Sequence, residues 1–191
     1  MIQYPNRKMN KELEHKPISH VGRGMSLEND LNDSNVYYLD CDKAVIHKKP
    51  TPIQVVKVDY PSRNCAKIVE AYYKVASTTD YNGIYRSKAI DFEAKETNSK
   101  VSFTFKAIHE HQINHLDAIL RHGGIAFVIL RFTQFDETYL IDAASLITMY
   151  RLPKKKSITY QEVRSIGHLI KQGLTPRLRY LDIVDELYFN Q

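Results

Sequence analysis

The run IAFVILRF, Ile125 to Phe132, places the strongest constraint on the fold. It is almost continuously apolar and rich in strand-forming residues, which is typical of a strand buried on both faces. Helical patterns precede and follow it, over about 26–39, 107–121 and 143–150. The order of helix, strands, helix, two strands and helices predicts an α/β fold, with a mixed sheet flanked by helices.

Two further helices are predicted near the end of the chain. Thr159 and Glu162 have the spacing of a capping box, in which the two side chains satisfy the first free N–H groups of a helix. The last helix is marked by apolar side chains at helical spacing. These are Tyr180, Leu181, Val184, Leu187 and Tyr188.

Composition favours one globular domain that binds a polyanion. The chain has 191 residues, 43% hydrophobic and 26% charged, with a net charge of +5 and a pI of about 9.0. Residues 1–22 are polar and predict a flexible arm, which leaves 23–191 as a single domain. The sequence shows no secretory signal and no run that could span a membrane, so we expect a soluble, cytoplasmic protein. Cys41 and Cys65 are most simply free thiols.

A projecting hairpin is predicted over about 48–75, with its turn at 61–64. Basic and tyrosine side chains alternate along it, a mixture suited to phosphates and exposed bases. An ordinary solvated hairpin would have a similar composition. The residues concerned are Lys48, Lys49, Lys57, Arg63, Lys67 and Lys74, with Tyr60, Tyr72 and Tyr73.

The segment IDFEAKET, residues 90–97, alternates apolar and charged side chains, as a strand with one face on a core does. Two turns compete as the point where the preceding strand reverses. Asn82-Gly83 is a strong hairpin dipeptide, whereas a reversal near Arg86-Ser87 places Asp80 opposite Glu93. We favour the second, because Gly83 within a strand would let the backbone of a ligand approach closely.

With that turn, the strand brings together groups that suit a hydrolytic metal site. Asp80 and Glu93 would hold Mg²⁺, which prefers carboxylate, water and phosphate oxygens. Lys95, on the same strand face, would stabilise charge that develops on a phosphate. The alternative is an ordinary solvated face with an idle Glu and Lys. Gln112 interrupts the apolar stripe of the 107–121 helix, so its amide oxygen would reach either the metal or a neighbouring backbone group.

Zinc is a weaker alternative on the same helix. In HEHQINH, the pattern HExxH fails because Ile113 stands where the second His is required. His111 and His115 remain as a pair spaced for one helix face, with no third ligand suggested.

Taken together, these motifs resemble the RecU family of Holliday junction resolvases from Gram-positive bacteria. STTDYNGIY lies ahead of DFEAKET, with VIHKKPTP before them and HEHQ after, and the likeness runs from RGMSLE to PRLRYLDIV. It implies a restriction-endonuclease-like homodimer that makes a Mg²⁺-dependent symmetric cut across four-way junction DNA, with Mn²⁺ as a substitute.

The resemblance also assigns residues. It implies Thr78, Asp80, Glu93 and Gln112 as metal residues and Lys95 as the transition-state stabiliser. The hairpin would be a stalk that enters the junction, with contacts from Lys48, Arg63 and Tyr73. A strand-exchange recombinase and a branch-migration helicase are implied as partner proteins.

Two other functions remain open at this point. One is a nuclease of the same fold that cuts ordinary duplex DNA. The other is an architectural protein that binds junctions without cutting them, which the presence of both carboxylates and Lys95 disfavours.

Overall fold

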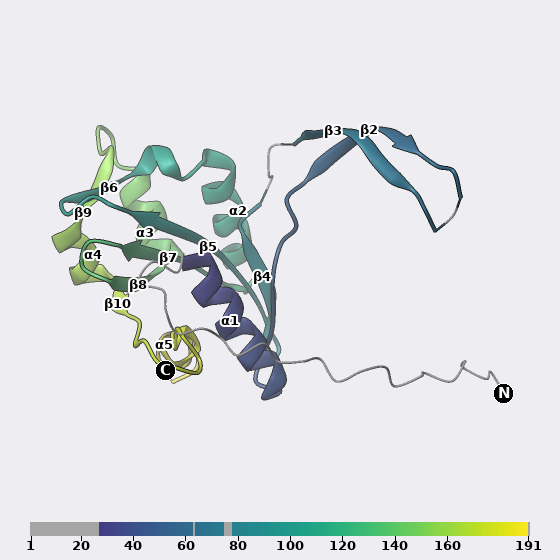
Figure 1. Ribbon diagram of the computed structural model, residues 1–191. Helices are drawn as coiled ribbons and strands as arrows, with labels where there is room; N and C mark the ends of the chain where they lie inside the picture. The colour runs from purple at the N-terminus through teal and green to yellow at the C-terminus, as the bar shows by residue number, and fades with distance from the viewer. Residues whose placement is uncertain (1–26, 63, 75–77, 191) are drawn as a thin grey trace.

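The structure, a computed structural model, describes residues 27–62, 64–74 and 78–190 (Figure 1). Its centre is a six-stranded sheet in the order β1-β4-β5-β7-β8-β10. Because β5 and β7 are parallel and the other neighbours antiparallel, the predicted mixed sheet is confirmed. The strands are β1 (Val45–Lys48), β4 (Tyr81–Tyr85), β5 (Lys88–Thr97), β7 (Ile125–Phe132), β8 (Glu137–Asp142) and β10 (His168–Leu169). The predicted arm, 1–22, lies outside the described residues.

Helices cover both faces of this sheet (Figure 1). Apolar side chains of α1 and α5 pack on one face, and those of α2, α3 and α4 pack on the other. The helices are α1 (Leu27–Asp40), α2 (Glu110–Arg121), α3 (Ala143–Tyr150), α4 (Tyr160–Ile166) and α5 (Tyr180–Tyr188). The predicted capping box of α4 is present, since Thr159 and Glu162 bond each other's backbone N–H.

Strand β7 is buried along its whole length, as its sequence predicts. Its side chains alternate between the two cores, because successive residues of a strand point to opposite faces. Phe127 and Ile129 pack with α1 and α5, whereas Val128 and Leu130 pack with α2, α3 and α4. The strand therefore carries the contacts that join both helical layers to one sheet.

The turn between β4 and β5 lies at Arg86-Ser87, which confirms the second of the two predicted reversals. Both residues have positive φ, 46° and 63°, as the two-residue turn of a tight hairpin requires. The predicted reason for Gly83 was wrong. A Cβ there would lie 2.0 Å from the Val45 carbonyl oxygen, so it is the backbone of β1 that approaches, not a ligand.

Helix α2 begins later than predicted. Residues Phe105–Ala107 form a short 3-10 helix, and Ile108 then takes an extended conformation with φ −110°. The chain turns into α2 only after His109, which is the N-cap. The apolar stripe had included Ile108 in the helix, because Ile108 is buried in the same core as Leu116 of α2 although its own backbone is extended.

The predicted stalk is present as a separate hairpin that projects from the core (Figure 1). Strands β2 (Ile53–Asp59) and β3 (Lys67–Tyr73) pair antiparallel, with a register irregularity near Lys57. Every residue of both strands is exposed.

Four short strands were not predicted from the sequence, namely β1, β6, β9 and β10. Strands β6 (Ser102–Thr104) and β9 (Ser157–Thr159) form a small second sheet, and β10 adds two residues to the edge of the main sheet. Segments this short carry too few residues to show a period. Among the described helices, none combines the length and apolar character needed to cross a membrane.

Candidate active site

The two predicted carboxylates meet at the start of β4. Tyr81 pairs with Phe92 across the hairpin, so the next step along the ladder sets Asp80 opposite Glu93. The backbone N–H of Asp80 donates a hydrogen bond to Glu93 Oε2 at 3.1 Å. The pairing of Asp80 with Glu93 that the sequence predicted is therefore confirmed.

Glu93 is fully buried, and its only ion pair among the described residues is with Lys95, whose Nζ lies 2.5 Å from Oε1. Burial, and after it the charge of Asp80, raise the pKa of Glu93 to about 7 against the opposing effect of Lys95. The positive charge of Lys95 is therefore too small an effect to cancel the rise in pKa that burial and the neighbouring Asp80 carboxylate cause. A divalent cation between the two carboxylates would supply the missing positive charge, so this donor set fits Mg²⁺.

A cavity of about 210 Å³ opens beside Asp80 and Lys95, whereas the buried Glu93 is not part of its lining. It is lined by residues from α1, β1, β4 and β5: Leu27, Glu28, Lys48, Asp80, Tyr81, Ala94, Lys95 and Glu96. The first turn of α1 is held over it, because the Leu27 N–H donates to Glu96 Oε2 at 3.1 Å. A phosphate group that entered this cavity would lie beside Asp80 and Lys95.

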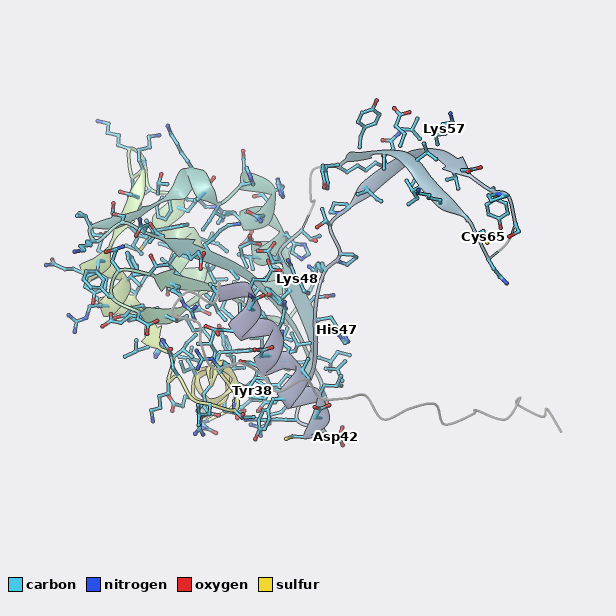
Figure 2. All side chains as sticks on the ribbon, in the orientation of Figure 1. Tyr38, Asp42, His47, Lys48, Lys57 and Cys65 are labelled. Atoms are coloured by element: carbon cyan, nitrogen blue, oxygen red, sulfur yellow. The ribbon has the colours of Figure 1, made fainter. Side chains whose placement is uncertain are left out.

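Glu28 is a residue of this cavity that the sequence analysis missed. Its carboxylate forms an ion pair with Lys48 at 2.5 Å, and Figure 2 shows Lys48 beside the first turn of α1. The signal in the sequence was slight, since an acidic residue in the first turn of a helix is expected for the helix dipole alone. The lining of the cavity therefore carries three carboxylates, those of Glu28, Asp80 and Glu96.

Gln112 is buried on α2, as its place in the apolar stripe predicted. Its Oε1 accepts the backbone N–H of His109 at 3.0 Å and so caps the helix. Within the described part of the chain it has no hydrogen bond to Asp80 or Glu93. The backbone alternative that the sequence left open is therefore the one seen, although an amide oxygen can accept a second bond.

The two threonines before Asp80 have different surroundings. Thr78 is half-buried and lies where the chain returns from the stalk, two residues from Asp80. Thr79 is buried, and its hydroxyl donates a short hydrogen bond to Asp91 Oδ1. Of the two, Thr78 is the one whose hydroxyl has no hydrogen bond within the part of the chain that the structure describes.

The geometry does not support zinc on α2. His115 Nε2 lies 3.2 Å from Asp91 Oδ2, whereas the ring of His111 stacks on that of His109 with centroids 5.3 Å apart. Among the residues the structure describes, no three His, Cys, Asp or Glu side chains gather where they could share a metal. A metal at Asp80 and Glu93 would therefore take its other ligands from hydroxyl, amide, water or phosphate oxygens.

The predicted DNA contacts fall in different places. Tyr73, at the end of β3, is 85% exposed, which leaves its ring free to stack. Lys48 belongs to β1 at the root of the stalk and lines the cavity, so its predicted place within the hairpin was wrong. Arg63 lies outside the described residues.

Comparison with known proteins gives close relatives over almost the whole chain. The family model described as RecU, Recombination protein U, matches residues 22–186. A protein of Geobacillus sp. (strain WCH70) named Holliday junction resolvase RecU is 53% identical over 190 residues, covering 98% of this chain and 94% of that protein. A protein of the same name from Shouchella clausii (strain KSM-K16) is 50% identical over 198 residues, covering 99% and 96%.

A solved structure is also similar. It is Hjc of Archaeoglobus fulgidus, described as a Holliday junction resolvase from an archaeal hyperthermophile, with a TM-score of 0.44 and 12% identity. The match covers 74% of this chain and 94% of that one. On the family match and the identity to the bacterial proteins, the chain belongs to the RecU family.

Proposed function

We propose that this protein is an endonuclease that resolves four-way DNA junctions by Mg²⁺-dependent, symmetric paired cleavage. The observation that carries the proposal is the opposition of Asp80 and Glu93, with Lys95 in an ion pair to Glu93. Of these three residues, Asp80 and Lys95 line an open cavity. The names of the relatives supply the substrate. The sheet and its flanking helices fit the restriction-endonuclease-like fold that the resemblance implied.

In this proposal Asp80 and Glu93 hold the metal, and Thr78 and Gln112 complete its inner or outer shell. When bound, Mg²⁺ would neutralise charge on the scissile phosphate and lower the pKa of a water. Lys95 places a positive charge beside the same phosphate, where negative charge develops in the transition state. Mn²⁺ offers the same preference for oxygen ligands and is expected to substitute.

We further propose a homodimer with two-fold symmetry. A two-fold axis would set two identical sites on opposite arms of a junction, so that paired nicks follow from symmetry. The stalk, with Arg63 and Tyr73, would contact the junction, and Lys48 would contact DNA at the mouth of the cavity. A strand-exchange recombinase and a branch-migration helicase remain predicted partners, and a cytoplasmic location remains a prediction.

The test compares D80N and E93Q with the wild type on a plasmid that extrudes a cruciform. Paired cuts made within one binding event linearise the plasmid, whereas independent cuts leave nicked circles. We expect linear product with Mg²⁺, none with chelator, and a loss of at least about 100-fold in both variants, because each removes a carboxylate that would hold the metal beside the reacting phosphate. Junction binding should persist.

The outcomes separate the alternatives. Cleavage of the linear duplex arms at the same rate as the junction would indicate a duplex nuclease. Junction binding without cleavage in Mg²⁺ or Mn²⁺ would indicate an architectural protein. Full activity in both variants would show that the site is elsewhere. E110Q is the matched control, because Glu110 is an exposed carboxylate on α2 outside the cavity.

A further inference from the structure

A second polar cluster lies directly behind the proposed site, at the root of the stalk. Lys49 directly precedes Pro50, where the chain leaves the core for the stalk. Thr79 lies where the chain has come back from the stalk to the core. The Lys49 N–H donates to the carbonyl oxygen of Asp80 at 2.7 Å, which continues the β1–β4 ladder to the point where the two chains diverge. The segment that enters the stalk and the segment that returns from it are therefore joined by a backbone hydrogen bond at Lys49 and Asp80.

The side chain of Lys49 turns inward here. Its Nζ lies 3.0 Å from Thr79 Oγ1 and 3.0 Å from Asp91 Oδ2. His115 of α2 reaches the same carboxylate at 3.2 Å. We call Lys49, Thr79, Asp91 and His115 the neck cluster. It ties the outgoing chain, the returning chain, strand β5 and helix α2 to one buried carboxyl group.

The cluster flanks the proposed metal residues on both strands. Asp91 is 5% exposed and lies on the same strand face as Glu93, two residues away. Thr79 directly precedes Asp80. A buried carboxylate that loses a hydrogen-bond or ion-pair partner destabilises the folded protein. A shift of Lys49, Thr79 or His115 would therefore also shift Asp91. Any displacement of Thr79 would move the backbone of Asp80, which bonds Glu93.

In the described part of the stalk, few other contacts fix its direction. All residues of β2 and β3 are exposed, so they are not buried against the core. The outgoing chain runs Lys49-Pro50-Thr51-Pro52, in which proline rings fix φ and hold the preceding residues extended. The base of the hairpin is closed by the Lys74 N–H, which donates to the Pro52 carbonyl at 2.9 Å. Lys49 is therefore attached to the hairpin through a short stiff segment.

We propose that the neck cluster couples the direction of the stalk to the geometry of the Asp80–Glu93 pair. Its members are positioning residues that act through Asp80 and Glu93 and do not touch the substrate. A junction that engages the stalk would thus align the metal site, and a stalk without its anchor would bind DNA without aligning it. The inference rests on the proposed function and adds a route by which junction recognition controls cleavage.

The test uses T79V, which removes the hydroxyl at nearly constant shape, and T79S, which keeps it. K49M removes the ammonium group in a second variant. The matched control is K88M, because Lys88 lies on the same strand as Asp91 and, among the described residues, its Nζ bonds only the exposed Gly123 carbonyl, at 3.3 Å. All are measured as the full chain.

The chain's own two cysteines report the direction of the stalk. Cys41 and Cys65 are both free and exposed, and Figure 2 shows Cys65 on the stalk and Asp42, next to Cys41, at the far end of α1. Spin labels on both, diluted with unlabelled protein, give the distance distribution within one chain. We expect it to broaden in T79V and K49M and to match the wild type in T79S and K88M.

The second readout is single-turnover cleavage at saturating junction. We expect T79V and K49M to cut about 10- to 100-fold more slowly and to need more Mg²⁺ for half-maximal rate, because misplaced groups lose reactivity steeply. Junction affinity should change by less than about 3-fold, since no DNA contact is removed. A role in stability alone would lower Tm without moving the distance distribution or the Mg²⁺ midpoint.

Wild-type distance distributions in T79V and K49M would overturn the proposal, as would a broadened stalk with an unchanged cleavage rate. If K49M does not fold, the comparison of T79V with T79S still tests whether the neck cluster anchors the stalk. A wild type that binds junctions without cutting them would defeat the proposed function, and the distance measurement would still show whether the cluster anchors the stalk.

Discussion

Strand β7 and the stalk are both rich in strand-forming apolar residues, yet they end in opposite environments. Every residue of β7 is buried, and every residue of β2 and β3 is exposed. Helices cover β7 on both faces, whereas the stalk is a lone pair of strands (Figure 1). Apolar content therefore reports strand formation in both regions, but the topology decides which of them becomes core.

The exposure of the stalk has a functional meaning. An isolated two-stranded hairpin is marginal in water, and exposed apolar side chains gathered in one place mark a binding surface. On the stalk they are interleaved with lysines, as Lys57 illustrates in Figure 2. A surface of this kind fits the proposed junction, whose exposed bases offer flat faces and whose phosphates offer charge.

The largest effect on the comparison should come from the core. Phe127 on β7 is fully buried and stacks on Phe92, with ring centroids 4.7 Å apart. We expect F127A to lower the free energy of unfolding by about 3–5 kcal/mol, because it leaves a cavity between two packed layers. Chemical denaturation of wild type and variant measures the loss. A change below about 1 kcal/mol would contradict the packing described for β7.

A smaller effect on the free energy of unfolding should come from the titration of Glu93, which lies between the core and the root of the stalk. Burial raises the pKa of Glu93 to about 7 in the folded state, above its ordinary value of 4.5. The folded state therefore holds this proton more tightly, and the stabilisation present below pH 4.5 is lost as pH rises through 7. Relative to E93Q, the wild type should lose on the order of 3 kcal/mol of stability across that window.

Denaturation at several pH values in chelator measures this loss. Saturating Mg²⁺ should reduce it, because a cation that binds the folded state favours the ionised carboxylate. The control is E70Q on the exposed stalk, which should follow the wild-type curve. Parallel curves for E93Q and wild type would show that Glu93 does not titrate in this range.

The smallest effect on stability should come from the stalk. Tyr73 is 85% exposed, so Y73A should change the free energy of unfolding by less than about 0.5 kcal/mol. Under the proposed function it should weaken junction binding by about 1–3 kcal/mol, because a ring that stacks on a base is lost. Denaturation and junction titration of the same preparation give both values. A large loss of stability would show that the stalk contributes to the core.

The sequence by itself determined the local features of this protein. Alternation along 90–97 gave a strand with Glu93 and Lys95 on one face, and the spacing of Thr159 and Glu162 gave a capped helix. The likeness of its motifs to RecU proteins was also visible in the sequence. Such features depend on residues that lie close together in the chain, so the period of side chains and a few caps are sufficient to reveal them.

The tertiary structure decided which of these residues meet. The alternation left open an idle, solvated charged face on 90–97, yet Glu93 and Asp91 are buried there by β4, α2 and the root of the stalk. Glu28 reaches the cavity only because α1 folds across β5, and Lys49 reaches Asp91 only because the stalk begins beside that strand. These contacts join residues far apart in the chain, and no local pattern encodes them, because they arise from how the layers pack.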